Sequence, residues 1–215
     1  RYAVRQVEAG ARLLVLSDRE IPEGQAPVPA LLATAAVHHH LIAVGMRARC
    51  GLIVETGEAR EIHHICCLLG YGAGAVVPWL ALDTIADLAR DDRLDGIDAT
   101  AAQAHYFAAI DKGILKVLSK MGISTLQSYR GAQIFECVGI NPEVVDRYFT
   151  WTPTRIGGAD LDLLATEVRF RHRWENNDGS IPSSRALDPG GKYKSRRSGE
   201  KHQYNPLTIA RLQQA

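Results

Sequence analysis

Three signals that often point to a function are weak in this sequence: paired cysteines, an excess of charge and long apolar runs. Four cysteines occur in 215 residues, and neither the adjacent Cys66 and Cys67 nor the isolated Cys50 and Cys137 have the spacing of a disulfide framework or a zinc site. The net charge of +1 gives no reason to expect a nucleic-acid or membrane partner. No apolar run reaches the roughly 18 to 20 residues that span a bilayer. We therefore expect a globular protein of the reducing cytoplasm.

The chain also lacks an initiator methionine, since it begins with Arg1. Without a targeting signal at that end, we expect a fragment of a longer protein. Its composition changes at residue 169, because the segment 169–201 holds nine Lys or Arg against four Asp or Glu, with Pro, Gly, Ser and Asn throughout. The segment has few aromatic residues, which favours an interdomain linker over a nucleic-acid-binding arm. We predict one domain over 1–168 and an irregular basic arm after it.

The first domain contains a repeated pattern of a short β-branched run followed by a helical stretch. Strands are predicted over 12–16, 50–55, 75–77 and 123–126. Helices are predicted over 30–44, after residue 57, and over 80–89, 101–121, 132–138, 142–149 and 161–168, with one more opened by Pro206. Successive strand–helix units predict an α/β fold with a parallel sheet. Four units make about half of an eightfold barrel, so we expect a partial TIM-barrel-like domain, with an open parallel sheet as the alternative.

The stretch 116–139 brings polar groups to the end of an expected strand. Ser128, Arg130 and Gly131 follow the strand predicted over 123–126, and the next helix is expected directly behind them. Loops after the carboxyl ends of parallel strands carry ligands, and a helix start offers free N–H groups to an anion. An arginine adds a bidentate donor. These three residues are therefore the predicted anion site, and no residue is predicted to be catalytic or to bind a metal.

Other polar clusters have structural explanations that we favour. Asp18 and Arg19 follow the first strand, where catalytic groups gather in barrels, but such a pair more often forms a local ion pair or cap. The run 38–40 is three histidines on one helix, which fan out over about 200°, so packed or hydrogen-bonded rings are expected. His63 and Cys67 have the i, i+4 spacing of many metal sites, but a zinc site needs three or four ligands.

Several motifs of this chain, in order, resemble the central region of the glutamate synthase large subunit. The most specific are SKMGIS and QSYRGAQIFE within 116–139. VLSDR at 15–19, VHHHL at 37–41 and GYGA at 70–73 resemble earlier parts of the same region. The segment 193–206 resembles the entry to the family's FMN-binding domain, with Ser198 where the family more usually has glycine. The resemblance thus covers nearly the whole chain.

The resemblance implies a place for this chain within a much longer enzyme. That parent converts glutamine and 2-oxoglutarate into two glutamates, and joins an amidotransferase domain, a central domain, an FMN-binding domain with an iron–sulfur cluster, and a β-helix. Residues 1–168 would be the C-terminal part of the central domain. Residues 169–215 would be a linker and the start of the FMN-binding domain. The other domains of the same large subunit would then be its partners, with a reductase small subunit or ferredoxin for the parent.

No catalytic, flavin or cluster residue of the family can be assigned to a position in this chain. The family's amidotransferase nucleophile is an N-terminal cysteine, whereas Arg1 stands here. The resemblance therefore implies a structural role, in which this region separates the amidotransferase and flavin sites and helps to wall the ammonia path, without a cofactor of its own. The electron donor of the parent, NADPH, NADH or ferredoxin, stays open. The alternative is a stand-alone phosphate-binding or scaffold α/β module.

Overall fold

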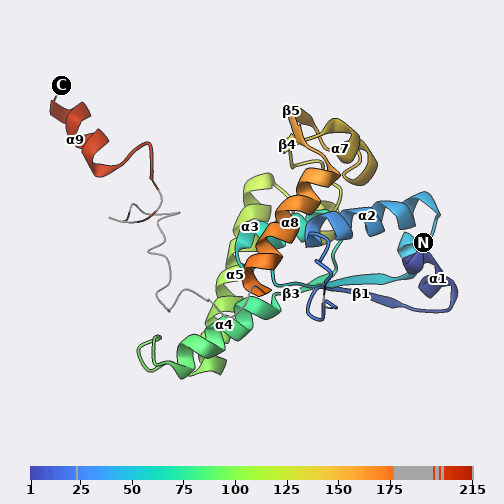
Figure 1. The fold of residues 1–215 in the computed structure, drawn as a ribbon, viewed down its shortest axis with the longest axis horizontal. Coiled ribbons are helices and arrows are strands. Elements are labelled where there is room, and N and C mark those ends of the chain that lie inside the picture. The colour runs from blue at the N-terminus through green and yellow to red at the C-terminus, as the bar shows by residue number, and fades with distance from the viewer. Residues whose placement is uncertain (23, 177–195, 197–198, 200, 215) are drawn as a thin grey trace. The chain divides into compact units, whose positions relative to one another are not determined.

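The computed structural model describes every residue except 23, 177–195, 197–198, 200 and 215 (Figure 1). It forms two units, Arg1–His172 and Arg173–Ala215. The described part of the second unit contains helix α9 (Pro206–Gln214), which Asn205 caps by accepting the N–H of Thr208 at 3.0 Å. Most of the predicted basic arm lies outside the described residues. The assignment of 1–168 and 169–215 to two family domains stays a prediction.

A parallel three-stranded sheet lies at the centre of the first unit. Strands β1 (Leu13–Ser17), β2 (Gly51–Glu55) and β3 (Ala75–Val77) pair in chain order, β1-β2-β3. All three match runs predicted from their β-branched and apolar residues. Neighbouring parallel strands in chain order, joined by helices, are the repeating arrangement of a (β/α)8 barrel.

A second pair of strands extends the parallel pattern. Strands β4 (Cys137–Ile140) and β5 (Thr154–Ala159) are also parallel, with irregularities in their register. Every strand pair among the described residues is therefore parallel, which confirms the predicted α/β fold of parallel, barrel-like βα units. The two sheets are separate, so the strands do not form one continuous barrel wall.

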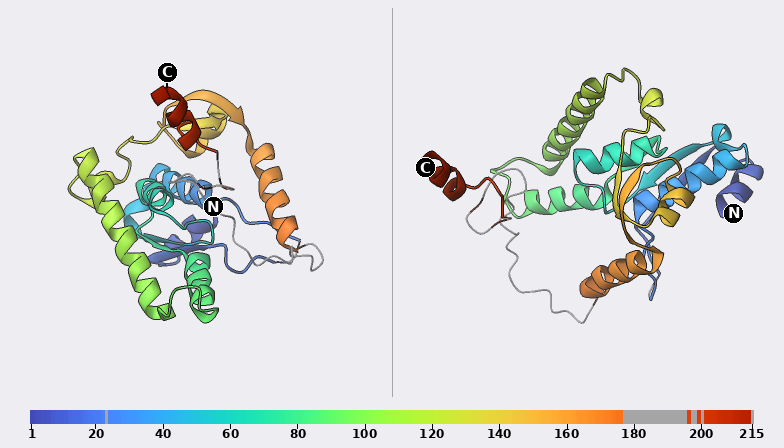
Figure 2. Two further views of the ribbon diagram at one scale, coloured as in Figure 1. Left: turned by 90° about the vertical axis from the view of Figure 1, so that its left-hand side faces the viewer. Right: turned by 90° about the horizontal axis from the view of Figure 1, so that it is seen from above.

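Eight helices and one short turn of 3₁₀ helix precede, connect or follow these strands among the described residues up to residue 176, the last of the eight running past the end of the first unit. They are α1 (Tyr2–Glu8), α2 (Ala30–Ala43), η1 (Arg47–Arg49), α3 (Ile62–Gly70), α4 (Trp79–Arg90), α5 (Ala99–Met121), α6 (Leu126–Tyr129), α7 (Pro142–Tyr148) and α8 (Leu161–Asn176). The longest, α5, is capped by Asp98, which accepts the N–H of Ala101 at 2.9 Å, and ends at Gly122 with a φ of 68°. Helices α4 and α5 run side by side (Figure 2).

One face of the three-stranded sheet is covered by helices α2 and α3 (Figure 1). Leu14, Leu52 and Val54 point to this side and are at most 8% exposed. They belong to two adjoining clusters, in which Val54 packs among α3 and α5 residues while Leu14 and Leu52 pack with Leu41 of α2. This burial contributes to the apolar stabilisation of the unit.

The opposite face of the same sheet carries apolar side chains that are left largely open. The strand register places Leu13, Val15, Ile53, Ala75 and Val77 on this side, and we call these five residues the open sheet face. Leu13 is 64% exposed and Val15 is 57% exposed. Parallel sheets are normally covered on both faces. The open sheet face is therefore unusual for a parallel sheet in a finished domain.

The strand predicted over 123–126 is wrong. The chain is irregular from residue 123 to Thr125 and then turns into α6. Thr125 caps that short helix, because its Oγ1 accepts the N–H of Ser128 at 3.3 Å. A threonine that serves as a cap competes with a strand at the same position, and this local hydrogen bonding prevailed.

The helix predicted over 132–138 is also wrong. Residues 132–136 are irregular, and β4 begins at Cys137. Gln133 has a φ of 55°, which no α-helix contains. A short apolar run fits a strand and a helix equally well by its periodicity. Here the pairing with β5 decides for the strand.

Candidate functional site

The carboxyl rim of the three-stranded sheet, where barrel enzymes carry their chemistry, is closed by hydrogen bonds to Asp18. Its carboxylate accepts the hydroxyl of Thr56, the N–H of Gly57 at 2.9 Å and the indole N–H of Trp79 at 2.7 Å. Thr56 is 1% exposed, so its hydroxyl depends on this partner. The Asp18 side chain thus joins the loops that follow β1, β2 and β3.

Arg19 adds ion pairs at the same rim. Its guanidinium lies 3.3 Å from Asp83 and 3.8 Å from Glu55, and stacks over the ring of Trp79 at 5.3 Å from the ring centroid. Glu55 also accepts the hydroxyl of Ser17 at 2.6 Å. Asp18 and Arg19 therefore have structural partners, but these come from other loops of the rim and not from the local ion pair or cap that the sequence predicted.

The three residues of the predicted anion site do not converge. Ser128 is exposed, and its amide and hydroxyl both bond Thr125, with an Oγ–Oγ1 distance of 2.9 Å. The N–H of Gly131 donates to the carbonyl oxygen of Gly70 at 3.0 Å. Two of the expected donors therefore already have acceptors within the chain.

Arg130 is the member of this set whose donors are not all used. Its Nε is buried and has no hydrogen-bond partner among the described residues. The guanidinium lies near the backbone of Gly74, with Nη2 3.7 Å from where a Cβ on that glycine would stand. Burial lowers the pKa values of His38 and Arg47, and the positive charge of Arg130 adds a smaller contribution in the same direction. Arg130 therefore lies within electrostatic reach of Arg47 and His38.

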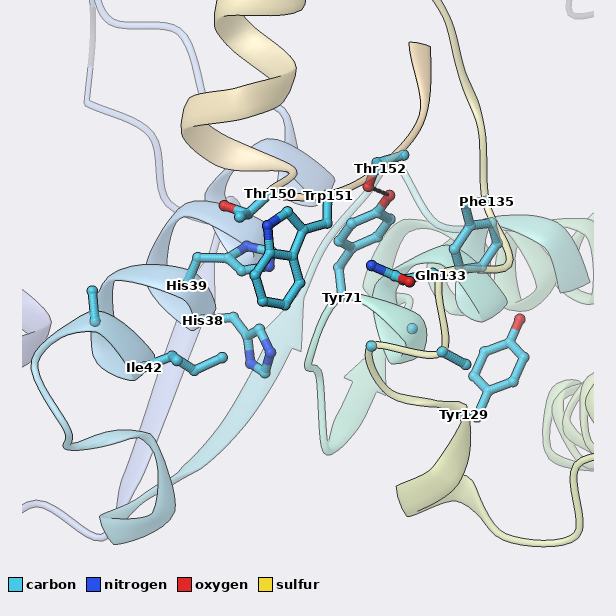
Figure 3. Close-up of a pocket in the computed structure, with 14 residues that line it drawn as sticks. His38, His39, Ile42, Tyr71, Tyr129, Gln133, Phe135, Thr150, Trp151 and Thr152 are labelled. Carbon is cyan, nitrogen blue, oxygen red and sulfur yellow. Dashed lines mark hydrogen bonds between the residues drawn. The ribbon is translucent and has the colours of Figure 1, made fainter.

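The loop around Gly131 forms one wall of a cavity of about 390 Å³ (Figure 3). Its lining comes from α2, from the end of α3, from the loop after α6 and from the turn after α7. The lining residues are His38, His39, Ile42, Ala43, Gly70, Tyr71, Tyr129, Gly131, Ala132, Gln133, Phe135, Thr150, Trp151 and Thr152. An apolar cavity with a few polar groups at its wall is the usual form of a small-molecule site.

His38 is held in a neutral, oriented state at this wall. Its Nδ1 accepts the Nε–H of Arg47 at 2.8 Å, while Arg47 also donates to the carbonyl oxygens of Cys50 and Gly72, each at 2.7 Å. Burial, followed by the charge of Arg47, lowers the pKa of His38 to about 4. A neutral ring that accepts at Nδ1 carries its proton on Nε2.

His39 has the opposite tautomer. Its Nδ1 lies 2.9 Å from the carbonyl oxygen of Ala35 and 3.0 Å from that of Tyr148. Two carbonyl oxygens can only accept, so Nδ1 carries a proton, which in a neutral ring leaves Nε2 as an acceptor. The prediction that the histidines of 38–40 are hydrogen-bonded or packed is confirmed for these two rings.

Aromatic side chains form the rest of the wall. Tyr71 stacks on Phe135 with ring centroids 5.6 Å apart, meets Phe149 edge-on at 5.2 Å, and shares a 2.6 Å hydrogen bond between its hydroxyl and that of Thr152. Burial raises the pKa of the Tyr71 hydroxyl, which stays protonated. The cavity therefore offers flat apolar surfaces beside the two histidines.

Two residues at the cavity have a strained backbone. Gln133 has a φ of 55° and Trp151 a φ of 66°, and Trp151 is 81% exposed. Positive φ is uncommon outside glycine and is an outlier for a bulky side chain. Such strain gathers at functional sites.

The other sequence candidate, His63 with Cys67, forms a contact within α3. The Cys67 sulfur lies 3.6 Å from Nε2 of His63, and burial raises the pKa of the thiol to about 11. Across the described part of the chain, no three His, Cys, Asp or Glu side chains gather as metal ligands. In the same part, no helix is long and apolar enough to cross a membrane.

Comparison with known proteins decides the family. The glutamate synthase central domain matches residues 1–141. The chain belongs to the glutamate synthase central domain family. This membership confirms the resemblance of the motifs at 15–19, 37–41, 70–73 and 116–139.

Curated relatives agree with this glutamate synthase assignment. The chain is 47% identical over 99% of its length to the NADPH glutamate synthase large chain of Bacillus subtilis, and 40% identical over its whole length to ferredoxin-dependent glutamate synthase 2 of Synechocystis. It spans 14% of each of these proteins. In a comparison with solved structures, a mutant flavocytochrome b2 with pyruvate bound is 15% identical to this chain, with a TM-score of 0.46. The match covers 78% of this chain and 36% of the flavocytochrome chain.

The cavity of this glutamate synthase segment was not predicted from sequence. His38 and His39 were singled out, but Tyr71, Gln133 and Trp151 were not. Positive φ at a glutamine or tryptophan leaves no mark in the sequence, and the carbonyl oxygen of Tyr148 reaches His39 from a distant part of the chain. The one available signal was the density of aromatic residues after α6 and α7.

Proposed function

We propose that this chain is a structural segment of a glutamate synthase large chain, which docks on other domains of the same polypeptide through the open sheet face. The chemistry of the parent takes place in those other domains. In this proposal the segment separates the amidotransferase and flavin sites and helps to wall the path of ammonia between them.

The open sheet face is the observation that carries this proposal. Leu13, Val15 and Val77 are each more than a third exposed on a parallel sheet whose other face is packed. Exposed apolar surface of this kind marks a contact with another structure. Further domains of a chain that is several times longer are the natural cover, since the curated relatives extend far beyond the matched part.

The closed carboxyl rim supports a structural role for the same sheet. A catalytic carboxylate needs a free face toward its substrate, whereas Asp18 is occupied by donors from Thr56, Gly57 and Trp79. This arrangement holds three loops together. The rim therefore serves the fold.

We propose that the parent protein has the activity for which its relatives are named, glutamate synthesis. Such an enzyme makes glutamate from glutamine and 2-oxoglutarate in the cytoplasm, and its FMN and iron–sulfur cluster belong to domains outside this chain. A reductase small subunit or ferredoxin would supply electrons, and the relatives named for NADPH and for ferredoxin leave that choice open. The residues of this chain supply packing and shape.

Intact mass and absorbance of the natural gene product test this proposal. A product much longer than 215 residues, yellow from bound flavin and able to form glutamate, is the expected result. A colourless product of this length would contradict the proposal. It would leave a free-standing module.

One observation favours such a module as a second candidate. The buried, unpaired Nε of Arg130 could donate to an anion, whereas the N–H groups of Ser128 and Gly131 are already bonded within the chain. Titration of the chain with inorganic phosphate, followed by the NMR signal of the Arg130 side chain, tests it. A saturable shift that Arg130→Gln abolishes would support this candidate, and no shift would remove it.

A further inference from the structure

The two histidines at the cavity wall present opposite hydrogen-bonding groups. The Nδ1 edge of His38 lies against Gly72 and Arg47, which leaves its Nε2–H edge on the side away from them. The Nδ1 of His39 is held by two carbonyl oxygens, which leaves the lone pair on its Nε2 as the acceptor of that ring. The rings are neighbours, with centroids 5.2 Å apart, and project from α2 toward Trp151 and Tyr71 (Figure 3). Two neighbouring rings of the wall therefore carry a donor and an acceptor.

We propose that this cavity binds a small planar molecule through a carboxamide group, whose carbonyl oxygen accepts from Nε2–H of His38 and whose N–H donates to Nε2 of His39. A carboxamide is the common group that carries an acceptor and a donor on one carbon and in one plane. This inference is independent of the role proposed above for the open sheet face.

The walls favour a flat ligand. Tyr71 and Phe135 are stacked at 26° between ring planes, and Trp151 borders the same space. Flat rings bind such surfaces in stacked or edge-on arrangements. A volume of about 390 Å³ lies within the range of sites for small ligands.

The strained residues give independent support for a site here. Asp92, Asp95, Gln133 and Trp151 are the non-glycine residues with positive φ in the described chain, and two of the four line this cavity. The indole of Trp151 is mostly exposed, so the packing of that side chain does not offset its backbone strain. A bound ligand that covers the indole would offset it.

A carboxylate fits this arrangement less well than a carboxamide. Both of its oxygens are acceptors, so one of them would face the lone pair on Nε2 of His39. The Arg47 guanidinium donates to Nδ1 of His38 and so strengthens the Nε2–H of that ring as a donor, which either group could use. The acceptor on His39 therefore decides between the two.

A series of three probes tests the proposal on the unaltered chain. Benzamide has both the carbonyl acceptor and the N–H donor of a carboxamide. N,N-dimethylbenzamide lacks the N–H donor, and benzoate has a second oxygen acceptor in place of the nitrogen. Each is titrated while NMR follows the indole of Trp151 and the rings of His38 and His39. We expect benzamide to shift these signals and to bind about three- to tenfold more tightly than the other two, because one neutral hydrogen bond is at stake.

The proposal is overturned if dimethylbenzamide or benzoate binds as tightly as benzamide. It is equally overturned if benzamide leaves the three side chains unshifted up to its solubility limit. These outcomes need no variant, so a folding defect cannot obscure them.

Matched variants then locate the preference. His39→Ala removes the acceptor and should abolish the advantage of benzamide over its dimethyl analogue. His40→Ala is the control, because His40 is exposed, follows on the same helix and does not line the cavity. A preference that survives His39→Ala, or that His40→Ala removes, contradicts the proposal.

Discussion

The carboxyl rim of the sheet and the cavity beside α2 use their polar groups in opposite ways. At the rim, Asp18 accepts hydrogen bonds from two other segments and Arg19 pairs with two carboxylates, so both charged groups have partners within the chain. At the cavity, His38 and His39 each use one ring nitrogen to hold their orientation and leave the other ring nitrogen available. Satisfied groups stabilise a fold, whereas oriented and unused groups are available to a ligand.

This difference reverses the usual expectation for a βα sheet. In barrels the loops after the strands carry the chemistry. Here that end is a structural junction, while the more promising site is built from a helix face and two irregular loops. The predictions below sharpen this contrast, beginning with the largest expected effect.

Removing the Asp18 carboxylate should cost the most stability. Asp18→Ala leaves the buried hydroxyl of Thr56 and the N–H groups of Gly57 and Trp79 without their acceptor, which we expect to lower the free energy of unfolding by roughly 4 kcal/mol. Urea unfolding measures it. Asp83→Ala is the control, since its pair with Arg19 is exposed and worth less than about 1 kcal/mol. Equal losses of stability in the two variants would contradict the structural role that we assign to the rim.

The cavity wall depends on the lack of a side chain at Gly72. A Cβ at this position would overlap the ring of His38, and the backbone of Gly72 has a φ of 113°. We expect Gly72→Ala to lower the free energy of unfolding by about 3 kcal/mol. Gly45→Ala has a similar positive φ, 71°, with open space, and should cost only about 1 kcal/mol. A similar cost for both would show that the His38 ring is not fixed against Gly72.

Stability should fall as the pH is lowered from about 6.5 to 4 because of His38. The unfolded chain binds a proton on this ring below its ordinary pKa of 6.5, whereas the folded chain does so only near 4. The unfolded state therefore binds more protons within this window. After allowance for the partial exposure of the ring, the expected loss is about 1 kcal/mol. Urea unfolding between pH 7 and 4 measures it, and His38→Gln should have the smaller slope. Parallel slopes would contradict the buried neutral state.

The smallest effect is expected at Trp151. Trp151→Gly relieves the positive φ, whereas Trp151→Ala keeps it, so the glycine variant should be more stable by about 1 kcal/mol. Both variants lose the indole and should bind benzamide more weakly. Thermal unfolding and the NMR titration measure the two effects. An alanine variant as stable as the glycine variant would mean that the backbone at 151 stores no strain.

The sheet was predictable because its signals are local. The runs that became β1, β2 and β3 are apolar and β-branched, and Asp98, Gly122 and Pro142 mark helix ends by chemistry that acts within one turn. Their parallel pairing follows from the alternation of strands and helices.

The stretch 116–139 was not predictable to the same degree, because distant partners decide it. Thr125 could cap a helix or continue a strand, and the run before Ile140 becomes a strand only because β5 lies beside it. The site depends on distance in the same way. The opposite tautomers of His38 and His39 are set by Arg47 and by the carbonyl oxygen of Tyr148, which sequence alone does not place next to them.

The most direct test of the central claim is the accessibility of the open sheet face in the natural gene product. A cysteine at Val15→Cys is treated with a maleimide in the 215-residue chain and in the whole gene product, and mass spectrometry locates the label. Val15 is 57% exposed here, whereas Cys50 and Cys66 are buried and serve as internal references. The account predicts rapid labelling of residue 15 in the chain alone and protection in the whole product. Equal labelling in both would show that nothing covers this face and would contradict the proposed role.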